Sequence, residues 1–540
     1  VGVGKVEQAL PFFKTAVEAN PSIAQFWLSY IDALIKLDHT ADARALFDQA
    51  KSKGVKEVGF DQMEKRLGLS ENKIPKDQNP PKEQLDSLMK LYNQNRLEQV
   101  FNKAQLLTKQ YSNSVVLWNL LGASAAQIGQ QEQAVSAFNK ILSIEPGSAE
   151  VYNNIGNALK DLGKLDEAIE SYNEAISLKP EYAEAYNNMG VTLQEQGHLE
   201  EAIKAYNEAI AMKPDIAGAY CNMGNALQKQ GKLHEAIEAH TKAIAIKPDY
   251  AKAYNNMGNT LQEQGKLDKA IEAHNKAISI KPDYADAYWN LSGTAENITE
   301  SKKWVEKCLE ANPRHPQAKL TFSALKFYQG DETTYNELLK SPLKDNAFMR
   351  SFAWAFRLPK LPPLHFHRWA LFDHMTNLSK KDRPFYEFGV WRGEAFRYLI
   401  KTFKKGYGFD TFEGLPEDWH DQKTGTYSSD GNIPKIKGGK FIVGKFNDTL
   451  PSFFAEERPM ASIINFDADL YSSTICALNC AKPVIDQDTI LIFDEFIINE
   501  NWEQDEYRAL EEFCANNDYT YEVLAISFYT KQVAVKIIGI

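Results

Sequence analysis

The sequence lacks the features of a membrane-spanning protein and of a general nucleic-acid-binding protein. None of its 540 residues belongs to an apolar run of the length, about 18 residues, that a transmembrane helix needs. Basic residues are in the minority, because 61 lysines and arginines stand against 72 aspartates and glutamates, for a formal net charge of −11. A general nucleic-acid binder would show a basic stripe, so the sequence predicts neither a membrane span nor a nucleic-acid partner.

Cysteine is scarce as well. The five cysteines are odd in number and lie inside helical patterns, which argues against a framework of disulfides. Residues 1–4, Val-Gly-Val-Gly, carry no signal-peptide pattern. A reducing compartment is therefore expected, and the predicted location is the cytoplasm.

A period of 34 residues dominates the first half of the chain. An aromatic residue recurs at this step at Trp118, Tyr152, Tyr186, Tyr220, Tyr254 and Tyr288, and a proline closes each unit at Pro146, Pro180, Pro214, Pro248 and Pro282. Small residues at fixed places between them allow two helices to touch, and the proline ends the second helix. The pattern closely resembles the tetratricopeptide repeat, an all-α helical hairpin that stacks into a right-handed superhelix.

The phase of the repeat sets the expected domain boundaries. Repeats are predicted over residues 1–70, the first of them truncated, and over residues 84–316. A polar break that contains prolines separates them at residues 71–83. Capping helices and a proline-stiffened linker are expected at residues 317–363, and a second domain at residues 364–540.

One asparagine position recurs on the first helix of successive repeats. Its members are Asn154, Asn188, Asn222, Asn256 and Asn290. An amide side chain both donates to and accepts from a peptide backbone, so such a row can hold an extended chain with little side-chain preference. The row is similar to that of the O-linked N-acetylglucosamine transferases, which implies a groove for a protein or an extended peptide. The alternative is that asparagine is repeat consensus and serves hydrogen bonds within the hairpins.

The carboxyl-terminal part alternates short apolar runs with helical segments. Strands are predicted at residues 385–388, 406–409, 440–446, 461–466, 489–493, 521–526 and 533–538. This alternation predicts an α/β domain with a doubly wound, Rossmann-like parallel sheet of seven strands. The chain is therefore expected to be multidomain, with a helical superhelix followed by this sheet.

The first strand, turn and helix of that domain predict a cofactor site. Gly389 and Gly393 frame the turn after the first strand, and the second strand ends at Asp410. Glycines let the backbone approach a ligand, and an acid at the end of the second strand accepts hydrogen bonds from ribose hydroxyls. The spacing of the two glycines departs from the dinucleotide fingerprint and suits S-adenosylmethionine, whose ammonium can pair with Glu387.

Four acids follow the fourth and fifth strands: Asp467, Asp469, Asp494 and Glu495. Those strands are neighbours in this fold, so the carboxylates are expected to converge. Crowded like charges need a cation, and hard oxygen ligands select Mg²⁺ or another divalent cation. Such an ion can orient a hydroxyl and lower its pKa. The alternative is that Asp494 and Glu495 merely end a strand and that Asp469 caps the next helix.

Four stretches together resemble the macrocin O-methyltransferase family. They are residues 387–393, 408–416, 448–451 and 467–474. The resemblance implies a class I methyltransferase domain that methylates sugar hydroxyls with S-adenosylmethionine and Mg²⁺. It also implies metal ligands at Asp467, Asp494 and Glu495 and a general base at Asp469.

The sequence thus predicts an S-adenosylmethionine- and Mg²⁺-dependent O-methyltransferase. The expected acceptor is a hydroxyl of a glycan, a glycosylated molecule or a small molecule, and the repeats are expected to recruit a protein or peptide. Two alternatives stay open: a metal-dependent glycosyltransferase in which Asp467-Ala468-Asp469 is an Asp-x-Asp motif, and a scaffold with a relic methyltransferase domain. The acceptor and any assembly into a homo-oligomer are left open.

Overall fold

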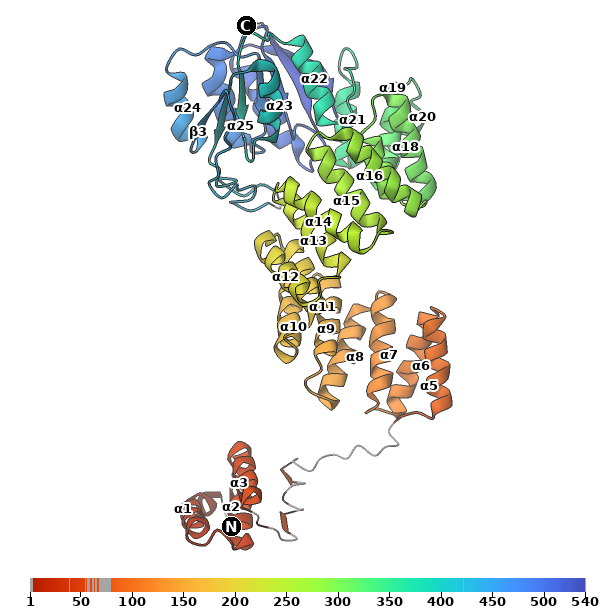
Figure 1. Cartoon of the computed structure of the whole chain (residues 1–540), viewed down its shortest axis with the longest axis vertical. Coiled ribbons are helices and arrows are strands. Elements are labelled where there is room, and N and C mark those ends of the chain that lie inside the picture. The colour runs from red at the N-terminus through yellow and green to blue at the C-terminus, as the bar shows by residue number, and fades with distance from the viewer. Residues whose placement is uncertain are drawn as a thin grey trace. The chain divides into compact units, whose positions relative to one another are not determined.

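The computed structural model describes residues 3–37, 39–53, 55, 59–60, 63, 66–67, 79–420 and 422–539. The chain divides into two compact units, Val1–Leu162 and Gly163–Ile540. Many of their helices are labelled in Figure 1. Of the break predicted at residues 71–83, the part up to residue 78 lies outside the described residues.

The first unit consists of helices that pack against their neighbours in the chain. They are α1 (Val3–Ala19), α2 (Ala24–Lys36), α3 (Thr40–Ser52), α5 (Lys82–Asn93), α6 (Leu97–Gln110), α7 (Val115–Gln127), α8 (Gln131–Ile144) and α9 (Ala149–Asp161). Trp118 of the 34-residue pattern, and Trp27 nearer the start of the chain, close the turns before their helices. The indole nitrogens of Trp27 and Trp118 donate to the carbonyls of Pro21 and Ser112, each over 2.8 Å. The pattern therefore has a local structural cause.

The second unit opens with further helical hairpins of the same kind. Their helices are α10 (Leu165–Leu178), α11 (Ala183–Glu195), α12 (Leu199–Met212), α13 (Ala217–Lys229), α14 (Leu233–Ile246), α15 (Ala251–Glu263), α16 (Leu267–Ile280), α17 (Ala285–Ser292) and α18 (Ile298–Ala311). A Cβ at Gly190 on α11 would lie 2.6 Å from the ring of Tyr206 on α12, so a glycine is needed where the two helices touch. Gly231 lies in the turn between α13 and α14 with a φ of +69°, the left-handed region that glycine adopts at no steric cost.

Two histidines take the place of that tyrosine in the following hairpins. His240 on α14 and His274 on α16 are fully buried, each against the glycine of its own first helix. Among the described residues, neither ring nitrogen of His240 has a hydrogen-bond partner. Burial lowers the pKa of His240 to about 4, because the charged imidazolium would lose its hydration.

The substitution His240→Tyr is therefore expected to make the second unit less sensitive to acid. Unfolded histidine titrates near pH 6.5, so between about pH 6.5 and 4 only the unfolded chain takes up the proton. The stability of the folded state is complete above this window and falls by about 3 kcal/mol as the pH drops through it. Tyrosine cannot titrate there, and Tyr206 shows that the site accepts it. Urea unfolding at pH 7 and pH 4 measures the difference; equal pH dependence of the two proteins would contradict this account.

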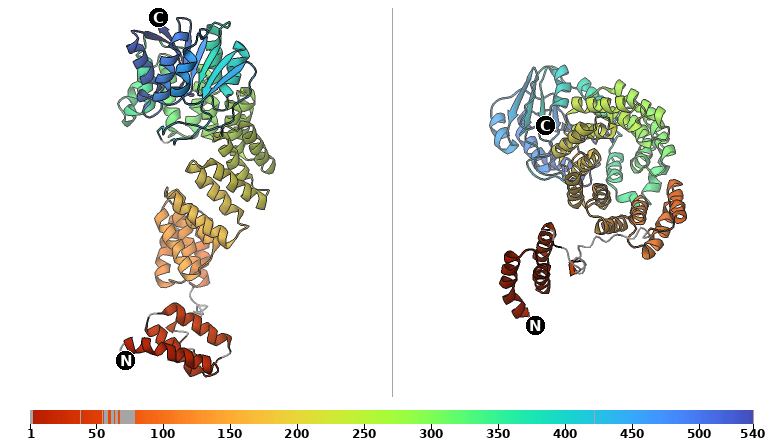
Figure 2. Two further views of the ribbon diagram at one scale, coloured as in Figure 1. Left: turned by 90° about the vertical axis from the view of Figure 1, so that its left-hand side faces the viewer. Right: turned by 60° about the horizontal axis from the view of Figure 1, so that its bottom comes forward.

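A seven-stranded sheet with helices on both faces follows the repeats (Figure 2). Its strands are β1 (Phe385–Phe388), β2 (Gly406–Asp410), β3 (Gly439–Val443), β4 (Ile463–Phe466), β5 (Ile490–Phe493), β6 (Thr520–Ile526) and β7 (Val533–Ile538), in the order β3-β2-β1-β4-β5-β7-β6. Phe385 and Ile463 pack with helices α22 (Arg368–Leu378) and α23 (Glu394–Phe403). Tyr386 and Ile464 face the other side, toward α24 (Phe446–Phe454), α25 (Tyr471–Ala481) and α26 (Glu506–Asn516).

The prediction of a wholly parallel sheet is wrong at one strand. β1 to β5 are parallel, but β7 runs antiparallel to both β5 and β6. Only six residues, 527–532, connect β6 to β7, whereas a parallel crossover needs a dozen or more. The sheet is therefore mixed.

The helices between the repeats and the sheet pack into the sheet domain. They are α19 (Pro316–Tyr328), α20 (Thr333–Leu338) and α21 (Ala347–Phe356). Phe352 on α21 makes an edge-to-face contact with Phe528, with ring centroids 4.7 Å apart. The hydroxyl of Ser351 accepts a hydrogen bond from the backbone of Ile498 over 2.9 Å. These helices share an apolar core with the sheet. On α19, Ala318 and Leu325 pack in a second cluster with Val305 of the last repeat helix.

No helix within the described residues combines the length and the apolar character that crossing a bilayer requires.

Candidate functional site

The carboxyl ends of four neighbouring strands open into one cavity of about 910 Å³ in the second unit. Glu387 on β1, Asp410 on β2, Asp467 after β4 and Asp494 after β5 line it. The order of the sheet reverses between β1 and β4, and ligands of open α/β sheets bind in the crevice at such a point. The volume is at the upper end of the range for sites of drug-sized ligands.

The residues predicted from the sequence meet largely in this cavity. Its lining includes the predicted cofactor, metal and base residues Glu387, Gly389, Asp410, Asp467, Asp469, Asp494 and Glu495. Gly393 has a φ of +77° and lies behind the turn, where a Cβ would come within 3.2 Å of Pro434. Of the predicted asparagine row, Asn290 lines the cavity; Asn154, Asn188, Asn222 and Asn256 do not.

The glycine turn after β1 is held from both sides. One carboxylate oxygen of Asp410 accepts the backbone N–H groups of Val390 and Trp391, over 2.7 and 2.6 Å, and the other accepts the N–H of Phe412 over 2.7 Å. Gly389 has a φ of +85°, and a Cβ there would overlap the backbone carbonyl oxygen of Asp467. Asp410 thus fixes the turn, and only glycine permits the approach of β4.

Glu387 is a buried acid with one unsatisfied oxygen. Its side chain is 1% exposed, and among the described residues its Oε2 has no hydrogen-bond partner. Burial raises the pKa of Glu387 well above its usual range. A buried acceptor without a partner costs stability, so this oxygen at the cavity wall is suited to a donor that arrives with a ligand.

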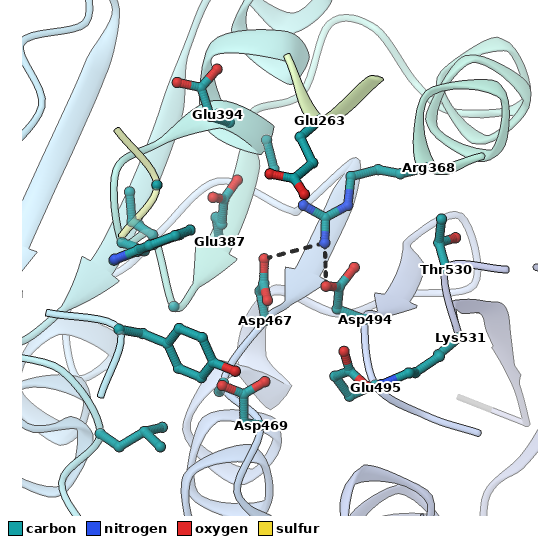
Figure 3. Close-up of a pocket in the computed structure, with 18 of the residues that line it drawn as sticks. Glu263, Arg368, Glu387, Glu394, Asp467, Asp469, Asp494, Glu495, Thr530 and Lys531 are labelled. Atoms are coloured by element: carbon teal, nitrogen blue, oxygen red, sulfur yellow. Dashed lines mark hydrogen bonds and ion pairs between the residues drawn. The ribbon is translucent and has the colours of Figure 1, made fainter. Parts of the chain in front are cut away.

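Two basic side chains that the sequence reasoning missed neutralise part of the acidic edge (Figure 3). Arg368, the first residue of α22, forms an ion pair with Asp494, and its guanidinium lies 3.9 Å from Asp467. The ammonium of Lys531 lies 2.9 Å from Glu495. Neither residue belongs to a recognisable motif, and both come from elements remote in sequence from the acids.

The cavity remains acidic even with these partners. Nine carboxylates line it against the four cationic side chains Lys229, Arg368, Lys445 and Lys531. Burial and the neighbouring Asp494 raise the pKa of Asp467, and burial and Glu495 raise that of Asp469. Asp469 also has a left-handed backbone with a φ of +58°, a strained conformation that clusters at functional sites. Such a surface favours a cationic ligand.

The acids have the right chemistry for a divalent cation, because their donors are carboxylate oxygens. As they lie, however, Asp494 and Glu495 are occupied by Arg368 and Lys531. Within the part of the chain that the structure describes, no three acids, histidines or cysteines converge as a metal-binding group. Binding such an ion therefore requires that these basic side chains move away.

The repeats supply a further wall of the cavity, which the sequence reasoning did not foresee. Gln228, Gln262, Glu263, Trp289 and Asn290 of helices α13, α15 and α17 line it. The amide of Gln228 donates to Glu263 over 2.6 Å, and Figure 3 shows the carboxyl group of Glu263 beside the guanidinium of Arg368.

Direct contacts fix this wall to the glycine turn. The guanidinium of Arg392 donates to the carbonyl of Gln230 over 2.6 Å, and the indole of Trp391 packs on Gly231 in the same repeat turn. One repeat later, the indole nitrogen of Trp369 donates to the carbonyl of Gln262 over 2.8 Å. The last repeats are therefore part of the site.

Comparison with known families identifies the helical repeats. A model described as "TPR repeat" matches residues 156–197 and 193–231, and models described as "Tetratricopeptide repeat" match residues 1–54, 115–148, 137–170 and 215–283. The prediction of tetratricopeptide repeats is confirmed over these residues. No curated protein sequence matches the chain.

Comparison with solved structures gives matches that each cover about a third of the chain. The crystal structure of MamA is 30% identical over 31% of this chain and 97% of its own, with a TM-score of 0.28. YrrB, whose structure is titled "a TPR protein with an unusual peptide-binding site", is 24% identical over 34% of this chain and 97% of its own, with a TM-score of 0.28. The protein pilF of Pseudomonas aeruginosa is 20% identical over 39% of this chain and 95% of its own, with a TM-score of 0.34.

Proposed function

We propose that this chain, whose helical part is built of tetratricopeptide repeats, is an S-adenosylmethionine-dependent O-methyltransferase resembling the macrocin O-methyltransferases. The observation that carries the proposal is the glycine turn held by Asp410, with the unpartnered Oε2 of Glu387 beside it at the point where the strand order reverses. This arrangement offers a close backbone approach, a ribose acceptor and a partner for an ammonium group.

The site residues suit the charges of this cofactor. S-adenosylmethionine carries a sulfonium and an ammonium, and the acidic cavity would attract both. Glu387 would accept the ammonium through its free Oε2. An ionised carboxylate has about four acceptor positions, and backbone N–H groups take three of them on Asp410, so one ribose hydroxyl can still be accepted there.

The methyl transfer requires an acceptor oxygen on the far side of the methyl group. That oxygen attacks the methyl carbon, the carbon–sulfur bond breaks with its electrons left on sulfur, and the hydroxyl proton passes to a base. Asp469 is proposed as the base, because it lines the cavity at the acidic edge. Once Arg368 and Lys531 have moved away from Asp494 and Glu495, these two acids and Asp467 would hold Mg²⁺. When bound, the ion would lower the pKa of the hydroxyl and orient it.

The substitution Arg368→Ala is expected to strengthen the binding of a divalent cation by about tenfold. The guanidinium occupies Asp494 at the place where the ion is proposed to bind, and a charge-assisted hydrogen bond contributes about 1.5–3 kcal/mol. Calorimetric titration with Mn²⁺ measures the affinity. Arg383→Ala is the control, since Arg383 pairs with Asp486 away from the cavity. Unchanged or weaker binding in Arg368→Ala would remove the arginine from the cation site.

The proposed activity is tested by methyl transfer. The full chain is incubated with S-adenosylmethionine labelled in its methyl group and with glycan, glycoprotein and small-molecule fractions, with Mg²⁺ or with excess chelator. We expect label in one acceptor fraction and its loss in chelator. Label that is independent of the chelator would overturn the metal assignment, and no transfer to any fraction would overturn the proposed activity.

A further inference from the structure

Two rows of amide side chains run along the first helices of the repeats and end in the cavity. The asparagine row comprises Asn188, Asn222, Asn256 and Asn290, and a glutamine row at the same 34-residue step comprises Gln194, Gln228 and Gln262. Gln194, Asn188, Asn222 and Asn256 lie outside the cavity lining, whereas Gln228, Gln262 and Asn290 belong to it. The polar surface therefore leads from the repeats into the site.

The position of this wall assigns it to the acceptor. The strand ends carry the acids and the glycine turn that suit the cofactor, and the repeats line another part of the same cavity. Methyl transfer needs the acceptor oxygen and the cofactor sulfur on opposite sides of the methyl carbon. With the cofactor against the strand ends, the wall that the repeats form is available to the acceptor.

The asparagine row is fixed before any ligand arrives. Asn222 donates its amide to Asn187 over 3.2 Å, Asn256 to Asn225 over 2.7 Å, and Asn290 to Asn255 over 3.0 Å. Each bond joins neighbouring repeats, so the row has a structural role in addition to any role in binding. A wall whose side chains are already ordered loses less entropy when it binds a chain.

The spacing of the rows fits an extended polypeptide. Helices α11, α13, α15 and α17 contact one another in succession, and packed helices lie about 8–10 Å apart. An extended chain advances about 3.3 Å per residue, so each repeat presents amides to about three residues of it. Amides match both the N–H and the C=O groups of a backbone without demanding a particular side chain.

We propose that the acceptor hydroxyl is carried by an extended polypeptide segment that lies along α11, α13, α15 and α17 and enters the cavity over Gln228 and Gln262. The hydroxyl belongs to the segment itself or to a sugar attached to it. The inference rests on the proposed methyl transfer and adds the class of acceptor and the surface that holds it.

The test compares two double variants of the full chain. Gln228→Ala with Gln262→Ala removes two amides of the cavity wall. Asn207→Ala with Asn275→Ala removes two exposed amides from the second helices α12 and α16, at one repeat position outside the cavity. Each protein is incubated with methyl-labelled S-adenosylmethionine and a soluble extract of the source cell. The label counted is the acid-precipitable label that becomes acid-soluble after protease digestion, which is the label on polypeptide. Cofactor affinity and helical signal are measured for the same proteins.

The wild-type protein and the Asn207, Asn275 variant are expected to label polypeptide equally, and the Gln228, Gln262 variant at least tenfold less, with cofactor affinity and helical signal unchanged. The proposal is overturned if the wild-type protein binds the cofactor but labels no polypeptide. It is also overturned if the two double variants label polypeptide equally. Failure of the wild-type protein to bind S-adenosylmethionine would instead overturn the proposed function itself.

Discussion

Replacing Gly389 with alanine is expected to abolish the binding of S-adenosylmethionine. The backbone of Gly389 is left-handed, and a Cβ there would overlap the carbonyl oxygen of Asp467. That oxygen cannot retreat, because the N–H of Asp467 donates to Phe388 in the pairing of β1 with β4, over 2.8 Å. Overpacking costs about 1–3 kcal/mol, and the left-handed backbone adds about 1–2 kcal/mol for a residue with a side chain.

The chain offers a matched control for this substitution. Gly425 has a φ of +87°, nearly that of Gly389, but a Cβ there would meet no atom within 4 Å. Gly425→Ala therefore has only the conformational cost of a left-handed backbone, without a steric overlap. Its affinity for the cofactor should stay within a few-fold of the wild-type value. Calorimetric titration with S-adenosylmethionine and thermal unfolding of both variants separate the two costs. Equal cofactor affinity in the two variants would show that the approach of β4 to Gly389 does not shape the site.

The substitution Asp469→Asn is expected to lower turnover by about 10²–10⁴-fold, the usual contribution of a positioned base. A hydroxyl is a poor nucleophile while it keeps its proton, and asparagine cannot accept that proton. The amide has nearly the shape of the carboxylate, so the affinity for S-adenosylmethionine should change little. Turnover is measured as labelled methyl transferred to the acceptor fraction, and cofactor affinity by calorimetry.

Asp467→Asn makes the same chemical change two residues earlier and serves as the comparison. Asp467 is proposed to bind the divalent cation, so this variant should bind Mn²⁺ more weakly and regain part of its turnover at high Mg²⁺. Asp469→Asn should show neither effect. If both variants are rescued by Mg²⁺, the two acids share one role and Asp469 is not the base.

Much of the site could be predicted from the sequence, because it follows from topology. Asp410 ends one apolar strand and Asp467 directly follows another, and the carboxyl ends of neighbouring parallel strands meet at one edge. The repeats could also be predicted from the sequence, because the same residue types recur every 34 residues. Both inferences depend on order along the chain alone.

The antiparallel β7 was within reach of the same reasoning. Residues 527–532 are too few for a crossover helix, so the length of this connection already excluded a parallel pairing.

The basic side chains and the repeat wall could not be predicted in this way. Arg368 reaches Asp494 over 126 positions of the chain, and Arg392 reaches Gln230 over 162. Such contacts depend on how a helical stack docks against a sheet, and no local pattern encodes that arrangement. The best hint in the sequence to this contact is two large aromatic residues. Trp391 lies in the glycine turn and Trp369 at the start of a helix, and both pack on the repeats.

The central claim is that the cavity binds S-adenosylmethionine, and a calorimetric titration of the full chain tests it most directly. Separate titrations use S-adenosylmethionine and a nucleotide sugar, UDP-N-acetylglucosamine, with Gly389→Ala as the negative control. The account predicts that one S-adenosylmethionine binds per chain, that Gly389→Ala abolishes this binding, and that the nucleotide sugar gives no saturable heat. Saturable binding of the nucleotide sugar without binding of S-adenosylmethionine would contradict it and favour the glycosyltransferase alternative.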